Sequence, residues 1–214
     1  INLHRRTCCM LFKNFLANSA SQLLYPVLSL LLVPFYLRHL GVEGYGLIGF
    51  YALLVSLLGV LTKGVGTAFL REVSRRDVNP EQRNTLRRLV GTFEAVYWAA
   101  GALVAAVLVP LSGIISSKWV HVESIPPRVV ELCVLLLSSR IALALPNVVY
   151  QAVFIGMQRQ VFGNLVNVAS VLTGAAATVA AVLAWNSVLA YCAVDVVAAC
   201  GTLVLLRYSL RRKV

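Results

Sequence analysis

The fold is indicated most clearly by residues 161–206, which read VFGNLVNVASVLTGAAATVAAVLAWNSVLAYCAVDVVAACGTLVLL. Asp195 is the one charged residue in this stretch, and the apolar residues do not alternate with polar ones. A transmembrane helix needs about 20 mainly apolar residues in a row, whereas a barrel strand needs about 10 that alternate. A short Trp-Asn-Ser turn at 185–187 separates the two apolar halves. The stretch therefore predicts two antiparallel transmembrane helices, at 161–184 and 188–206.

The rest of the chain has the same character. Hydrophobic residues make up 59% of the 214 positions and charged residues 13%, whereas soluble domains carry about 25% charged residues. Backbone polar groups in hydrocarbon must bond to one another, so long apolar runs form helices. The sequence predicts an all-α fold, a polytopic bundle of about six transmembrane helices. We expect a single unit, 1–214, with spans at about 15–37, 45–70, 89–115, 129–150, 161–184 and 188–206.

Basic residues are distributed unevenly between the predicted loops. If the chain starts in the cytoplasm, 14 of the 19 basic residues fall on the cytoplasmic side, three on the opposite side and two within the membrane. Such a bias sets the orientation of membrane proteins, so we expect both termini in the cytoplasm. The same bias explains the net charge of +11 and favours anionic membrane lipids as partners. A nucleic-acid partner is not expected.

No catalytic or metal-binding pattern is evident in the sequence. The five cysteines lack the spacing of a disulfide framework or a zinc site, and the three histidines are dispersed. The motifs of serine hydrolases, zinc proteases and P-loop proteins are absent. The glycines within 41–46 lie between two predicted spans with no strand before them, which favours a tight turn over a phosphate site. We therefore expect no enzyme activity, no cofactor and no metal.

Four charged residues fall within apolar spans: Lys63, Glu94, Arg140 and Asp195. A charge inside the bilayer is costly and usually faces a partner or a water-filled cavity. At about 1.5 Å per residue, Lys63 and Glu94 lie about 12 and 9 Å from one membrane edge. Arg140 and Asp195 lie about 18 and 14 Å from the other edge, close to the midplane. The spacing predicts two layers of opposite charges, either neutralising one another between packed helices or lining a hydrated substrate cavity.

Polar residues also line one face of the helix at the start of the first predicted span. This face includes Asn18 and Gln22. Such residues often join helices through hydrogen bonds, and they also suit a vestibule open to the cytoplasm. Together with the four charges, they complete the candidate substrate-binding cavity, which consists of Lys63, Arg140, Glu94, Asp195, Asn18 and Gln22.

Several stretches resemble a known family. They are NFLAN at 14–18, LLVPFYLRHLG at 31–41 and GYGLIGF at 44–50, with weaker matches at 63–64 and 156–159. They resemble the bacterial polysaccharide repeat-unit flippases, the O-antigen translocases of the multidrug/oligosaccharidyl-lipid/polysaccharide exporter superfamily. Position 63 is a lysine where the family pattern has an acidic residue, which argues against an acid-based coupling role there.

The resemblance covers nearly the whole chain but about half of a family member. It implies one lobe of a two-lobe flippase fold that encloses a central cavity. The implied function is movement of an undecaprenyl-pyrophosphate-linked sugar unit from the inner to the outer leaflet of the bacterial inner membrane. The implied partners are the lipid-linked oligosaccharide and either a missing C-terminal lobe or a second copy of the chain. Two alternatives stay open, a cation-coupled exporter of small molecules from the same superfamily and a non-transporting membrane scaffold.

Overall fold

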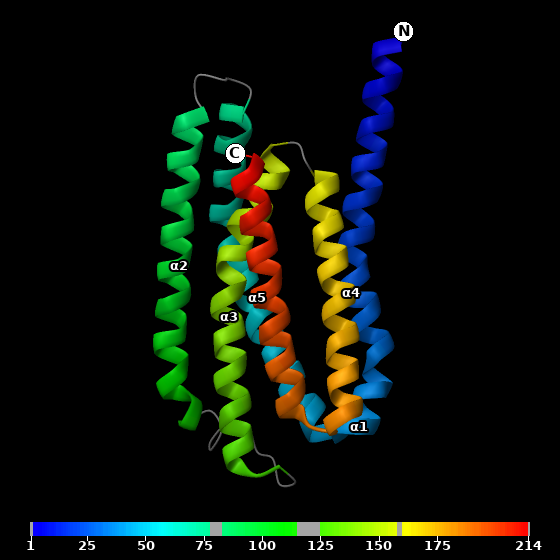
Figure 1. Ribbon diagram of the computed structural model, residues 1–214, viewed down its shortest axis with the longest axis vertical. Helices are drawn as coiled ribbons and strands as arrows, with labels where there is room; N and C mark the ends of the chain where they lie inside the picture. The colour runs from blue at the N-terminus through cyan, green and yellow to red at the C-terminus, as the bar shows by residue number, and fades with distance from the viewer. Residues whose placement is uncertain (1, 78–82, 115–124, 158–159, 214) are drawn as a thin grey trace.

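Every regular element of the described structure is an α-helix (Figure 1). The computed structural model describes residues 2–77, 83–114, 125–157 and 160–213, with side chains at 23–54, 56–57, 66–75, 84–114, 125–157 and 161–210. The helices are α1 (Asn2–Asp77), α2 (Arg83–Ile114), α3 (Pro127–Gly156), α4 (Gln160–Trp185) and α5 (Val188–Lys213).

Helix α1 is broken at Gly41 into two arms. Gly41 has φ 75° and ψ 175°, a conformation that residues with a Cβ rarely adopt. We call residues 2–40 the first arm and residues 42–77 the second arm. Figure 1 shows the first arm in blue running down from the N-terminus and the second arm in cyan running back up. The tight turn predicted near 41–46 is thus a one-residue break in an otherwise helical segment.

Five helices of the described residues are long and apolar enough to cross a membrane. The first of these stretches, Leu23–Leu54, runs across the Gly41 break. With the two arms counted separately, the described residues form six helical segments, which confirms the predicted all-α polytopic bundle. The chain is therefore a multi-pass membrane protein. Several helices run past the predicted spans, and α5 continues to Lys213 where the prediction ended at 206.

Helix α3 lies at the centre of the bundle. It packs against α1, α2, α4 and α5, whereas the described backbones of α2 and α5 do not approach one another closely. The spanning stretch of α3 is 44% buried, compared with 6% to 22% for the other four. A Cβ on Gly101 of α2 would lie 2.7 Å from the backbone oxygen of Ala142 on α3. Glycine is therefore needed there for the two backbones to approach closely.

The connections divide between two ends of the bundle. Figure 1 shows both termini, the end of α1, the start of α2, the end of α3 and the start of α4 at one end of the bundle. The Gly41 break and the α4–α5 turn lie at the other end, where Asn186 has φ 46° and its N–H donates to the Val182 oxygen (2.8 Å). The first end carries Arg71, Arg75, Arg87, Arg88 and Arg207 on described helices, and we call it the basic end.

Candidate functional site

Arg140 on α3 and Asp195 on α5 form an ion pair inside the membrane-spanning helices. The Arg140 Nε lies 3.2 Å from the Asp195 Oδ2, and the two side chains are 25% and 22% exposed. The two residues meet because α3 and α5 pack side by side and both start at the end of the bundle opposite the basic end (Figure 1). The predicted pairing of these two charges is confirmed.

The pair leaves hydrogen-bonding groups unused. An arginine side chain has five N–H donors and a carboxylate has two acceptor oxygens. Among the described residues, the pair makes one bond, from the Arg140 Nε to the Asp195 Oδ2. The two terminal nitrogens of Arg140 and the Oδ1 of Asp195 have no partner in that part of the chain. Because the pair is also partly exposed, a polar ligand can be held there.

Tyrosines from three helical segments surround this pair. Tyr25 and Tyr36 come from the first arm, Tyr51 from the second arm and Tyr191 from α5. Tyr191 lies one turn before Asp195 on α5, and the ring of Tyr36 packs against that of Tyr191. Tyr51 lines a small cavity with Ile141, the residue after Arg140. We call these four tyrosines, together with the ion pair, the tyrosine-flanked pair.

Packing explains how the tyrosines are placed. Tyr36 and Tyr191 meet edge to face with ring centroids 5.3 Å apart, and the Tyr36 hydroxyl lies 3.0 Å from the hydroxyl of Thr178 on α4. Tyr191 precedes Asp195 by one helical turn, so both face the same side of α5. Tyr25 and Tyr36 are eleven residues apart, about three turns, and share a face of the first arm. These spacings were available in the sequence, but nothing there indicated which helix they would face.

Glu94 on α2 belongs to a second group nearer the basic end. Its Oε1 lies 2.9 Å from the Arg207 Nη2 of α5 and accepts a hydrogen bond of 2.9 Å from the Tyr150 hydroxyl of α3. The last predicted span ended at 206 and left Arg207 outside it. In the structure α5 continues to Lys213 and holds Arg207 within reach of Glu94. The group ties α2 to α5 across the central helix.

The six predicted cavity residues therefore do not form one described cluster. Arg140 lies ten residues from Tyr150 on α3, which places the two ion pairs about 15 Å apart along that helix. The backbones of Asn18, Gln22 and Lys63 are helical within α1, but their side chains lie outside the described ones. The predicted layer of Lys63 with Glu94 and the cavity roles of Asn18 and Gln22 thus stay predictions.

Two buried amide groups were missed by the sequence reasoning. The Asn147 Oδ1 on α3 and the Asn164 Nδ2 on α4 are buried and have no hydrogen-bond partner within the described part of the chain. Nearly all buried polar atoms in proteins are hydrogen-bonded, so such atoms call for an explanation. Asn147 lies seven residues after Arg140, two turns along the same face of α3. A polar track thus continues from Arg140 towards the basic end.

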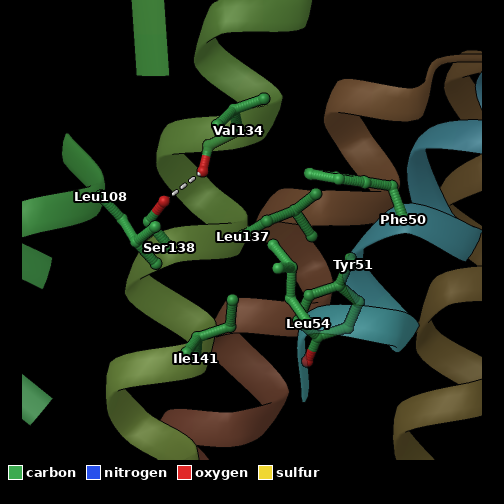
Figure 2. Close-up of a pocket in the computed structure, with 8 residues that line it drawn as sticks. All are labelled: Phe50, Tyr51, Leu54, Leu108, Val134, Leu137, Ser138 and Ile141. Carbon is green, nitrogen blue, oxygen red and sulfur yellow. Dashed lines mark hydrogen bonds between the residues drawn. The ribbon is translucent and has the colours of Figure 1, made fainter. Parts of the chain in front are cut away.

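A small cavity lies between the second arm, α2 and α3 (Figure 2). Its lining is apolar and includes Tyr51, Leu108 and Ile141. Figure 2 shows that the Ser138 hydroxyl bonds to the Val134 oxygen at 2.7 Å. A volume of about 10 Å³ is close to the minimum for one water molecule. This cavity is therefore a packing defect rather than a substrate site.

Comparison with known proteins gives one match. A family model described as polysaccharide biosynthesis protein matches residues 11–214. The matched range contains the Gly41 break, both ion pairs and all of helices α2 to α5. No curated protein and no solved structure matches the chain.

Proposed function

The chain belongs to the polysaccharide biosynthesis protein family, and on this basis we propose that it carries lipid-linked polysaccharide repeat units across the bacterial inner membrane. The cargo is an oligosaccharide on undecaprenyl pyrophosphate, which moves from the inner to the outer leaflet. No bond is made or broken in this step. The protein is therefore a flippase and not an enzyme.

The ion pair of Arg140 and Asp195 is the observation that carries this proposal. Ionisable residues within membrane spans usually pair with one another or face a hydrated path for a polar substrate. This pair is partly exposed and keeps unused donors and an unused acceptor. A sugar that passes the bilayer core needs such groups near the midplane, while its lipid tail stays in the hydrocarbon.

The orientation follows from the basic end. Cytoplasmic loops carry an excess of lysine and arginine, and the inner leaflet supplies anionic headgroups. We place the basic end, and with it both termini, in the cytoplasm. Substrate then enters from the basic end and leaves from the end that holds the Gly41 break.

A second lobe completes the transporter. Alternating access in transporters of this kind is a rocking of two repeats around a shared site near the bilayer midplane. The described helices form one such repeat. The other repeat is supplied by a C-terminal lobe or by a second copy of this chain.

The test is genetic complementation. The complete reading frame that contains this chain is expressed in a strain without its own repeat-unit flippase. We expect surface polysaccharide to return, and Arg140→Gln to reduce it at equal protein level. Drug resistance without surface polysaccharide would favour a small-molecule exporter. Variants that alter protein yield but not polysaccharide per molecule would favour a scaffold.

A further inference from the structure

The net charge of the tyrosine-flanked pair limits what it can bind. Arg140 contributes one positive charge and Asp195 one negative charge, and among the described residues no other charged side chain is bonded to them. A pyrophosphate needs surplus positive charge or many donors, and here it would face the carboxylate of Asp195. A sugar is neutral and has hydroxyl groups that both donate and accept hydrogen bonds. The unused nitrogens of Arg140 and the unused Oδ1 of Asp195 match such a ligand.

The tyrosines add an aromatic surface of the kind that contacts sugar rings. Tyr25 is 60% exposed, whereas Tyr36 and Tyr51 are 6% and 7% exposed. Tyr25 shares a face of the first arm with Tyr36, which packs against Tyr191 one turn before Asp195. Small-molecule sites combine aromatic walls with a few placed polar groups. The ring of Tyr25 is thus the wall available to the C–H face of a sugar.

Two buried amide atoms lie nearer the basic end. The Asn147 Oδ1 and the Asn164 Nδ2 are an acceptor and a donor without described partners. Asn147 lies on the Arg140 face of α3, about 10 Å nearer the basic end. The proposed path of the cargo enters from that same end.

The ion pair of Glu94 and Arg207 has fewer unbonded polar atoms than the pair of Arg140 and Asp195. The Glu94 Oε1 is already bonded to both Arg207 and Tyr150. This group joins three helices and offers fewer free atoms. We assign it a structural role.

We propose that the tyrosine-flanked pair is a glycan subsite that binds a neutral sugar of the cargo by hydrogen bonds to Arg140 and Asp195 and by contact with Tyr25, while the pyrophosphate is held elsewhere. This assignment rests on the proposed function and deepens it, because it separates the recognition of the sugar from that of the charged linkage.

Binding is measured with free sugars, which avoids partition of a lipid probe into the membrane. The chain is placed in phosphatidylethanolamine–phosphatidylglycerol nanodiscs and titrated with N-acetylglucosamine, galactose and maltose. Saturation-transfer NMR detects the ring C–H protons that contact protein, and empty nanodiscs give the background. We expect at least one sugar to bind, and excess inorganic pyrophosphate not to displace it.

Variants test the named residues. Tyr25→Leu and the double variant Arg140→Gln, Asp195→Asn should each weaken sugar binding about tenfold, as expected for loss of a charge-assisted hydrogen bond or of an aromatic contact. Trp185→Leu is the matched control, because Trp185 is 69% exposed at the end of α4 and should leave sugar binding unchanged. If the double variant does not fold, Tyr25→Leu still decides the question, since this side chain is exposed.

Three results would overturn the assignment. These are no sugar signal above empty nanodiscs, equal binding by Tyr25→Leu and the control, or displacement of the sugar by pyrophosphate. Complementation separates this inference from the proposed function. Restored surface polysaccharide without sugar binding defeats the glycan subsite alone. Sugar binding without restored polysaccharide, with the complete reading frame, defeats the proposed flippase.

Discussion

At the level of single residues, two ion pairs stabilise helices that pass through a lipid environment. Arg140 with Asp195 joins α3 to α5, and Glu94 with Arg207 joins α2 to α5. The first pair makes one bond and is open to a ligand, whereas Glu94 also accepts a bond from Tyr150. Removing one partner of such a pair is more damaging than exchanging both, because it leaves an uncompensated charge among apolar helices.

Exchanging the charges of the first pair tests their contact. Arg140→Ala and Asp195→Ala should each lower the free energy of unfolding by about 2 kcal/mol, the range for a hydrogen bond to a charged group. The double exchange Arg140→Asp with Asp195→Arg should recover part of this loss. Protein yield and denaturant unfolding in detergent measure the effect. A double exchange that is no more stable than the worse single variant would show that the two residues do not act as partners.

At the level of elements, the packing of α3 controls the bundle. α3 contacts the other four helices, and its approach to α2 depends on a single missing side chain at Gly101. The Gly41 break has a different requirement. A Cβ there would meet no atom within 4 Å, so the backbone conformation alone calls for glycine.

Two glycines on α2 provide a matched test of that packing. Gly101→Ala should destabilise the protein by about 1–3 kcal/mol, because the added Cβ would lie 2.7 Å from the Ala142 backbone oxygen and force the helices apart. Gly91→Ala should be neutral or stabilise by up to about 1 kcal/mol, since no atom lies within 4 Å and alanine favours helix. Thermal unfolding in detergent compares the two variants. Equal effects would mean that α2 and α3 do not approach closely at Gly101.

At the level of the whole molecule, the ends of the described helices gather at two ends of the bundle. The basic end holds both termini, and the opposite end holds the Gly41 break and the α4–α5 turn (Figure 1). This division follows from an even number of helical segments. The arrangement does not itself say which end of the bundle faces the cytoplasm. The positive-inside bias predicts that the basic end does.

Maleimide labelling tests this orientation. Cys8, Cys9 and Cys200 are replaced, while Cys133 and Cys192 stay because they are 0% exposed and should not react. Asn186→Cys should react with an impermeant maleimide in whole cells. Ser74→Cys, near the basic end and exposed, should react after lysis alone. Reaction of Ser74→Cys in whole cells would reverse the assigned orientation.

Local sequence patterns predict much of this architecture. Apolar runs such as 161–184 identify spanning helices, since hydrocarbon forces the backbone to bond within itself. The short segment at 185–187 makes the last two helices antiparallel, and their structure agrees. The contact of Arg140 with Asp195 was also predictable, because depth along two helices and the cost of an isolated charge limit the choice of partner.

What the tertiary structure alone decided is which faces meet. Tyr25, Tyr36, Tyr51 and Tyr191 read as ordinary apolar positions until the two arms and α5 bring them around one ion pair. Arg207 follows the last predicted span, and only the structure shows that α5 continues past it and pairs Arg207 with Glu94. The physical reason is the same in both cases. Hydropathy is a property of the chain along its length and sets depth in the membrane, whereas the rotation of each helix about its axis is set by packing against its neighbours.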